Sequence, residues 1–303
     1  MLPRVSKDPP KTELPALLWH YATFESLEGI ITKGEVFASN LAYVNDTEEF
    51  QHSIKPLVNY LKDVAGPTIS TLMREAGALD VPRDVQSMIG GFVRRGVYAA
   101  CFSKKADDLS QWRSYSPRPP GFAIGFDRNL LREATEDYNW CTLTDCQYLN
   151  SEQLLAEIRQ VVDPLILDME VERAQFPVPA ELEELQQFGM RWAAKIAWAV
   201  APLASRNKHP TFASEEEVRL IVDPTRVTNI AMRFVVNYRL SGSLIVPYVK
   251  IPVQPELGIW PIKMIIVGPC PHQSAVIAAT QQMCSQHGWT VDVISSKIPF
   301  RNW

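Results

Sequence analysis

Hydrophobic and polar positions along the chain predict short strands separated by amphipathic helices. Residues 17–21 are apolar around a single histidine and predict the first strand. In residues 23–33 the apolar side chains recur at helical spacing, with Thr23 suited to the N-cap and Gly34 placed for a left-handed C-cap. Residues 36–39 predict a second strand. The chain is therefore expected to open with a strand, a helix and a strand.

The same patterns continue to the C-terminus. Further strands are predicted at residues 97–102, 121–126, 141–149, 217–222, 233–239, 244–251, 262–267 and 290–294. Helices are predicted at residues 47–64, 67–76, 82–95, 108–115, 151–168, 181–201 and 273–287. Two helical blocks, at about 47–95 and 151–205, interrupt the strands, so we interpret them as insertions.

The chain shows no sign of division into several domains. No Gly/Ser-rich linker, repeat or low-complexity tract occurs in its 303 residues. Residues 1–15 carry four prolines and no apolar run, which favours a flexible leader over a secretory signal. We therefore predict one α+β domain over residues 16–303, with a mixed, mostly antiparallel sheet.

Composition bears on the compartment and on the class of partner. The longest apolar run near a helix, residues 192–204, contains a lysine and a proline and is shorter than the roughly 20 residues that span a bilayer. Five cysteines, an odd and dispersed number, favour a reducing cytoplasm over a disulfide scaffold. A net charge of −4 gives no overall attraction to nucleic acid or to a membrane surface, although a local basic patch stays possible.

The sequence contains none of the common short motifs that would indicate a catalytic mechanism or a metal site. Cys141 and Cys146 have no histidine nearby, and Cys270 with His272 lacks a second pair, so zinc spacing is not matched and no metal is expected. The chain also contains no nucleophile elbow, no phosphate-binding P-loop and no dinucleotide-binding glycine motif. The usual signatures of hydrolases, P-loop enzymes and Rossmann proteins are therefore missing.

Polar residues near strand ends and turns are the remaining candidates. His20 ends an apolar strand, where a histidine is more often a core residue than a site residue. Asn45, Asp46 and Glu49 suit a turn and a helix start as well as a site. For Trp112, packing in the core and stacking on a ligand are equally good interpretations.

A row of charges opens the strand predicted at 217–222. Alternation along an extended strand places Glu215, Glu217 and Arg219 on one face. Two carboxylates and a guanidinium on one face indicate either a salt-bridge network or a site. If Arg219 lies beside Glu217, its charge should keep that carboxylate ionised at neutral pH.

An ordered series of short motifs resembles a large bacterial family, domain of unknown function 2971. They are Leu18-Trp19-His20-Tyr21 with Gly29-Ile30, Asn45-Asp46-x-x-Glu49-Phe50, Cys101-Phe102-Ser103, Leu109-x-x-Trp112-x-x-Tyr115, Gly121-Phe122-x-Ile124-Gly125-Phe126-Asp127, Glu215-x-Glu217-x-Arg219, Ile265-Ile266-Val267-Gly268-Pro269 and Ile298-Pro299-Phe300-Arg301. The resemblance extends over nearly the whole chain from Leu17. It departs at Val218, where the family usually has tryptophan.

That family in turn resembles the ADP-ribosyltransferases at the level of the fold, which implies NAD as a substrate. The resemblance implies that Glu217 and His20 are catalytic, with Glu215, Asn45, Asp46 and Glu49 in support. It also implies that His20 binds the other ribose of NAD or its phosphates. The residues implied to bind NAD are His20, Tyr21, Ser103, Trp112, Tyr115 and Arg219.

Two hypotheses for function follow from the resemblance. The first is an enzyme that consumes NAD, transferring ADP-ribose to an unknown macromolecule or hydrolysing NAD, as a bacterial toxin or phage-defence effector. The second is a non-catalytic module that uses the same fold to sense a nucleotide or to bind a protein.

Overall fold

The computed structural model describes residues 17–43, 49–64, 97–116, 119–136, 140–175, 182–222, 235–241, 243–254 and 259–299. The strands are β1 (Leu17–Ala22), β2 (Glu35–Asn40), β3 (Tyr98–Ser103), β4 (Phe122–Asp127), β5 (Cys141–Asp145), β6 (Glu217–Val222), β7 (Asn237–Ser241), β8 (Leu244–Pro252), β9 (Ile262–Val267) and β10 (Asp292–Ser295). The helices are α1 (Phe24–Lys33), α2 (Glu49–Val64), α5 (Leu109–Tyr115), α6 (Arg128–Glu136), α7 (Ser151–Arg173), α8 (Leu182–Arg206) and α9 (Gln273–Gln286), with 3₁₀ turns η1 (Leu41–Tyr43) and η2 (Pro210–Glu215).

The ten strands of the described residues form a single sheet. Its order is β10-β9-β4-β1-β3-β2-β8-β7, and β6 pairs with both β3 and β5. Among the described strand pairs, β9 with β10 is parallel and the others are antiparallel. The predicted α+β fold with a mostly antiparallel sheet is therefore confirmed.

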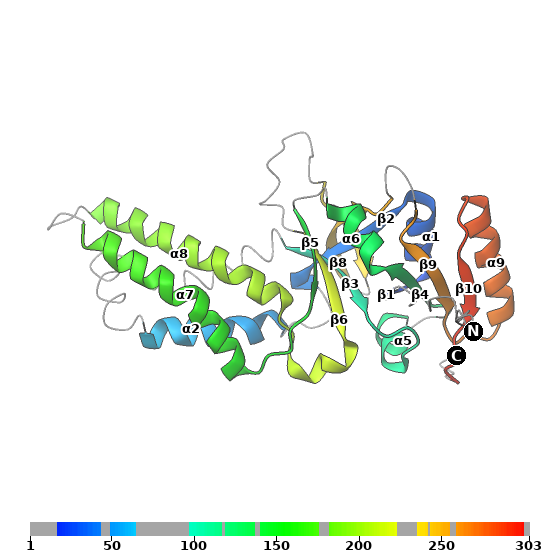
Figure 1. Ribbon diagram of the computed structural model, residues 1–303, viewed down its shortest axis with the longest axis horizontal. Helices are drawn as coiled ribbons and strands as arrows, with labels where there is room; N and C mark the ends of the chain where they lie inside the picture. Colours follow the sequence, from blue (N-terminus) through cyan, green and yellow to red (C-terminus); the bar gives the residue numbers. More distant parts are fainter. Residues whose placement is uncertain are drawn as a thin grey trace, which may run out of the picture.

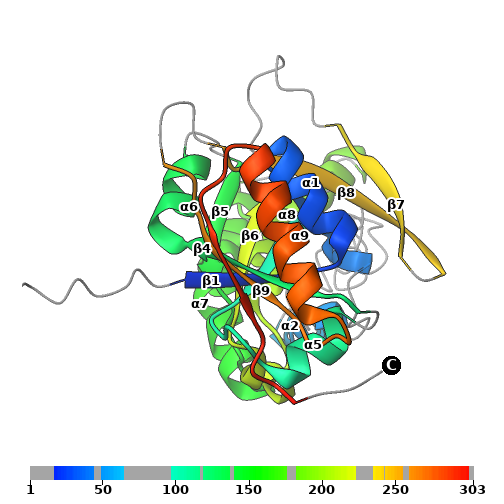
Figure 2. The same cartoon turned by 90° about the vertical axis from the view of Figure 1, so that its right-hand side faces the viewer.

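Helices cover both faces of this sheet. On one face, α1, α6 and α9 pack on alternate residues of the central strands and form the largest apolar core; α1 and α9 lie in front of the sheet in Figure 2. On the other face, α5 packs on β1, β4 and β9 through Trp112. Helices α2, α7 and α8 form a second core that reaches the sheet through Ala99 and Ile221, and they extend away from the sheet in Figure 1.

The sheet forks at β3. One edge of β3 pairs along its whole length with β6. The opposite edge pairs with β1 at Ser103 and with β2 at Tyr98 and Ala99. Strands β1 and β2 therefore diverge from the same edge, and Cys101 lies at the point where they separate.

Local sequence signals account for several element ends. Gly34 adopts the left-handed conformation, with φ of 65°, and its N–H donates to the Ile30 carbonyl, which ends α1 as predicted. Asp108 caps α5 by accepting from Ser110 N and Gln111 N. Asn150 and Gln153 form a reciprocal capping box at the start of α7.

Some predicted elements differ from the structure or fall outside it. The strand predicted at 141–149 ends at Asp145, and α6 was not predicted. The strand predicted at 233–239 is shifted to β7, with residues 231–234 outside the described part. The helices predicted at 67–76 and 82–95, and the leader at 1–15, also fall outside the described residues. The division into one domain with two insertions stays a prediction.

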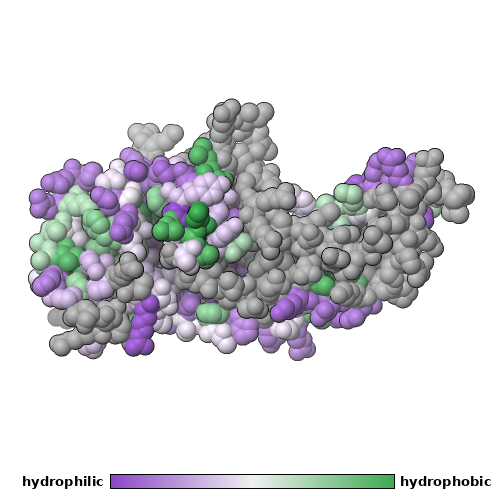
Figure 3. All heavy atoms as spheres, turned by 180° about the vertical axis from the view of Figure 1, so that it is seen from behind, coloured by the Kyte–Doolittle hydropathy of each residue, from purple (hydrophilic) through white to green (hydrophobic). Residues whose placement is uncertain are grey.

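No helix in the described part of the chain is long and apolar enough to cross a membrane. Seen from behind, apolar side chains lie among polar ones over the half of the molecule that carries the sheet (Figure 3). The β7–β8 hairpin exposes several of the large apolar side chains, namely Tyr238, Leu240, Leu244 and Ile245.

Candidate functional site

A buried cluster of charges lies at the start of β6. Glu217 and Arg219 alternate onto the sheet face that also carries Ser103 and Cys101, their register partners on β3. Arg219 Nε donates to Glu217 Oε1 at 2.8 Å, and Nη2 donates to Oε2 at 3.3 Å. Glu217 is 5% exposed and Arg219 is 2% exposed. The pair is therefore shielded from water by the protein.

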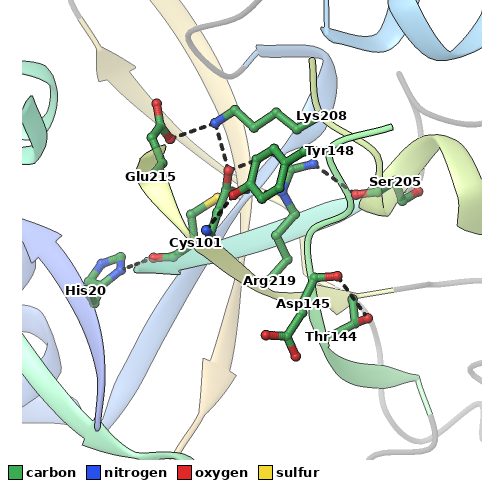
Figure 4. A network of polar contacts seen from close by, with 10 residues as sticks. His20, Cys101, Thr144, Asp145, Tyr148, Ser205, Lys208, Glu215 and Arg219 are labelled. Carbon is green, nitrogen blue, oxygen red and sulfur yellow. Dashed lines mark hydrogen bonds and ion pairs between the residues drawn. The ribbon is translucent and has the colours of Figure 1, made fainter. Parts of the chain in front are cut away.

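Lys208 completes the cluster from outside the strand. Its Nζ lies 2.8 Å from Oε2 of Glu217 and 2.8 Å from Oε2 of Glu215 (Figure 4). Lys208 follows the end of α8, where its N–H donates to the Gln147 carbonyl. The two carboxylates and two cations balance in charge.

Arg219 also ties β6 to the end of α8. Its Nη1 donates to the carbonyl oxygen of Ser205, in the last turn of the helix, at 2.9 Å (Figure 4). Carbonyl groups in the last turn of a helix lack intrahelical partners and carry partial negative charge, so a guanidinium is a favourable partner there. The helix and the strand are thus joined through the same side chain that binds Glu217.

The cluster keeps Glu217 ionised. Burial raises the pKa of this carboxyl, but the charges of Arg219 and Lys208 outweigh burial and hold the pKa at about 2, below the ordinary value of 4.5. For Lys208, the nearby Glu217 outweighs burial and raises the pKa of the ammonium group. Both partners are therefore charged at neutral pH, as predicted for Glu217 from the adjacent arginine.

Cys101 connects Glu217 to His20. The Cys101 thiol hydrogen-bonds to the Glu217 carboxylate, and burial raises the pKa of this thiol. On the other side, Nδ1 of His20 lies 2.9 Å from the Cys101 carbonyl oxygen (Figure 4). The two residues predicted to be catalytic therefore meet the same residue at the fork of the sheet.

His20 fills the gap between the diverging strands. Its ring packs against Phe102, with ring centroids 5.6 Å apart. Burial, opposed by the Cys101 carbonyl and assisted by the charge of Arg239, lowers the pKa of His20, so the neutral ring is favoured. Because a carbonyl only accepts, Nδ1 carries the proton and Nε2 is the acceptor nitrogen.

Two tyrosines border the cluster. Tyr148 Oη accepts from the Glu217 backbone N–H at 2.7 Å, and burial raises the pKa of Tyr148 to about 12. Burial likewise raises the pKa of Tyr115, which interacts electrostatically with Cys101 and Lys208. Tyr115 is half-buried, and no hydrogen bond of its hydroxyl is found within the described ranges. Of the tyrosines implied to bind NAD, Tyr115 is thus the one that interacts with the cluster, whereas Tyr21 interacts with Asp107 and Asp108.

Other predicted ligand-binding residues have structural contacts. Ser103 Oγ donates to the Glu215 carbonyl at 2.7 Å and accepts from Lys105 N. Tyr21 Oη donates to the Lys105 carbonyl and accepts from Asp108 N. These bonds hold the segment between β3 and α5.

Trp112 belongs to the core. Its indole is 2% exposed, meets the Tyr21 ring edge-on at 4.8 Å and donates from Nε1 to Asp107 Oδ1 at 2.7 Å. This burial favours the core-packing alternative, and the ligand-binding role implied for Trp112 stays a prediction.

The strand prediction for Glu215 is also wrong. Glu215 ends the 3₁₀ turn η2, and Glu216, with φ of 46°, adopts the left-handed conformation before β6 begins. Glu215 still reaches the cluster, through Lys208 and not through strand alternation. Sequence reasoning missed Lys208 because an isolated lysine nine residues before the strand has no distinguishing pattern.

The remaining supporting residues are not placed. Asn45 and Asp46 lie outside the described residues, and Glu49 begins α2 without a described side chain. Their supporting role stays a prediction. In the described part of the chain, no group of three or more His, Cys, Asp or Glu residues is arranged to hold a metal ion.

Residues 111–220 match the family "Protein of unknown function (DUF2971)". The match confirms the family resemblance over this segment. Neither a curated protein nor a solved structure matches the chain.

The DUF2971 segment contains most of the charge cluster. It begins in α5 and ends in β6, and it includes Tyr115, Tyr148, Ser205, Lys208, Glu215, Glu217 and Arg219. Cys101 and His20 lie before it in the sequence and join the cluster through β3 pairing and the hydrogen bond at the fork. Val218, the departure from the family, is fully buried in the core on the opposite face.

Proposed function

We propose that this protein is an NAD-consuming enzyme of the ADP-ribosyltransferase type, which transfers ADP-ribose to a macromolecule or to water. One observation carries the proposal. Glu217, an ionised carboxylate with a pKa of about 2, and His20, a neutral imidazole, both contact Cys101 at the fork of the sheet, Glu217 through the thiol and His20 through the backbone carbonyl. An ionised carboxylate and a neutral hydrogen-bond acceptor suit the ribose hydroxyl groups of a dinucleotide.

The chemistry needs a negative charge where positive charge develops. In the proposed step the bond between ribose C1′ and the nicotinamide nitrogen breaks, and its electron pair leaves with neutral nicotinamide. The ribose passes through an oxocarbenium-like state, and water or an acceptor nucleophile then forms the new bond at C1′ and loses its proton to solvent. A fixed carboxylate lowers the energy of such a state. Glu217 is assigned this role.

Ligand binding at Glu217 requires one contact to change. Both of its oxygens accept hydrogen bonds, Oε1 from Arg219 and Oε2 from Lys208 and Arg219. A ribose hydroxyl can replace Lys208 at Oε2 while Glu215 keeps Lys208 paired, because Lys208 already bonds to both acids. Arg219 remains to orient the carboxylate.

The same contacts favour a second candidate function. A carboxylate that is 5% exposed and bonded to two cations is also typical of a structural ion-pair network. In that case the protein is a non-catalytic module on the same fold that senses a nucleotide or binds a protein. It then binds its ligand without cleaving the nicotinamide–ribose bond.

Product analysis separates these functions. Purified full-length protein is incubated with NAD, and nicotinamide, ADP-ribose and modified protein are followed by mass spectrometry. Time-dependent nicotinamide release that is lost in Glu217→Gln supports the enzyme. NAD that remains intact with wild-type protein, both alone and with a cell extract as the source of acceptors, contradicts it.

A further inference from the structure

Arg239 is a cation at the fork that pairs with no carboxylate in the part of the chain that the structure describes. It lies on β7, and its Nη2 donates to Oγ of Ser39 on β2 at 2.8 Å. Its guanidinium carbon lies 6.0 Å from the centre of the Tyr248 ring. Within the described ranges, no aspartate or glutamate contacts it. Arg239 is also accessible to solvent.

Lys208 is a cation of the same molecule that is paired with carboxylates, and its pKa can be compared with that of Arg239. Burial alone lowers the pKa of either cation. Glu217 and Glu215 reverse that effect at Lys208, whereas burial lowers the pKa of Arg239 against only a small opposing effect from Tyr248. A partly desolvated cation without a counter-charge is stabilised by an incoming anion.

Arg239 reaches the fork from the side opposite to Glu217. Ser39, its hydrogen-bond partner, pairs with Ala99 of β3, and Cys101 follows two residues later on the same face. Two residues of a strand cover about 7 Å. Strand β6 brings Glu217 to one edge of β3, while β2 brings Ser39 and Arg239 to the other.

The protonation of the His20 ring limits which groups it can bind. With Nδ1 donating to the Cys101 carbonyl, the neutral ring presents Nε2 as an acceptor. An acceptor nitrogen suits a ribose hydroxyl but not a phosphate oxygen, which is itself an acceptor. A nucleotide that reaches His20 therefore needs another residue for its phosphates.

We infer that Arg239 and Ser39 form a subsite for the diphosphate group of a nucleotide. The inference rests on the proposed function and extends it, since Glu217 and His20 would take the ribose. The planar guanidinium has several N–H donors in a fork that fits phosphate oxygens, and one Nη remains after the bond to Ser39. The Ser39 hydroxyl accepts from Arg239, so its own proton is left to donate to the same phosphate.

Direct binding tests the subsite without any need for catalysis. Calorimetry on the full-length protein is done with ADP-ribose and with inorganic pyrophosphate as separate probes. Arg239→Met is expected to weaken ADP-ribose binding about 10- to 100-fold, as for loss of a hydrogen bond to a charged group. Ser39→Ala should weaken it less. Arg132→Met is the matched control, because Arg132 is exposed on α6 and bonds only to Asn129 in the described contacts; it should bind like the wild type.

Each outcome separates this inference from the proposed function. Arg239-dependent ADP-ribose binding without nicotinamide release supports the subsite and refutes the enzyme. Nicotinamide release with undiminished ADP-ribose affinity in folded Arg239→Met supports the enzyme and overturns the subsite. Wild-type protein that binds neither probe, or binds pyrophosphate as tightly as ADP-ribose, overturns the nucleotide subsite. If Arg239→Met is unfolded, Arg239→Gln is measured under the same criteria.

Discussion

The ammonium group of Lys208 lies 2.8 Å from the carboxylate of Glu217, and both side chains are about 95% buried. Two charges in such a place depend on one another, because removal of one leaves the other buried with a single remaining partner, Arg219 for Glu217 and Glu215 for Lys208.

Lys208→Met should destabilise the fold strongly. Breaking a buried ion pair from one side costs about 3–5 kcal/mol, and Arg219 would remain to offset part of this. The free energy of unfolding, measured in urea, checks the prediction. Lys104→Met is the control, because Lys104 pairs with Asp145 at the surface and such pairs contribute about 0–1 kcal/mol. If Lys208→Met and Lys104→Met lower the free energy of unfolding equally, the buried pair stabilises the fold no more than a surface pair does.

The stability contributed by Glu217 should disappear in acid. Its folded pKa of about 2 lies below the ordinary 4.5, so ionised Glu217 stabilises the fold above about pH 4.5, and this is lost as pH falls toward 2. The full contribution is on the order of 3 kcal/mol, of which about 2 kcal/mol is lost by pH 3. The difference in unfolding free energy between wild type and Glu217→Gln should therefore shrink by about 2 kcal/mol between pH 6 and pH 3. A constant difference would contradict the ion pairing.

Glu217→Gln should reduce nicotinamide release about 100- to 1000-fold, since a neutral amide cannot stabilise the oxocarbenium-like state. Glu215→Gln should reduce it less, because Glu215 bonds to Lys208 and not to the reacting sugar in the proposed arrangement. Turnover is measured beside a melting curve for each variant. A folded Glu217→Gln protein with unchanged turnover removes most of the case for the transferase.

The charge of Arg239 should be visible in the titration of His20. Arg239 lowers the pKa of His20, so Arg239→Met should raise that pKa. NMR of the histidine ring nitrogens follows both the pKa and the tautomer, and Nδ1 should carry the proton in the neutral ring. His209 is a suitable internal reference, because its ring lies at η2 and bonds to Thr211. A signal showing the proton on Nε2 would contradict the hydrogen bond to Cys101.

Trp112 should matter for stability and not for ligand stacking. Trp112→Ala is expected to cost about 3–5 kcal/mol, as for other buried aromatic residues. Tyr115→Phe should change stability by less than about 0.5 kcal/mol, because it removes a hydroxyl without a described hydrogen bond. Chemical unfolding of both variants provides the test. A Trp112→Ala protein of normal stability would favour ligand stacking over core packing as the role of this residue.

The sequence alone determined those helix ends and strand bounds that depend on neighbouring residues. The end of α1 at Gly34 and the extent of β6 and β9 follow from residues only a few positions apart. Alternation also placed Glu217 and Arg219 on one face of β6 correctly, because the side-chain period of a strand is two. The opposite case is Glu215, where alternation failed because a left-handed Glu216 precedes the strand.

Tertiary structure decided which residues meet. Lys208 gains its role from the packing of α8 against β6, and Cys101 from the pairing of β3 with β6. Arg239 acts electrostatically on His20 only because β1 and β2 separate at one edge of β3 and the β7–β8 hairpin extends that edge. These contacts join residues far apart in the chain, and their energies depend on burial and on neighbouring charges, which no local pattern of hydrophobic and polar residues contains.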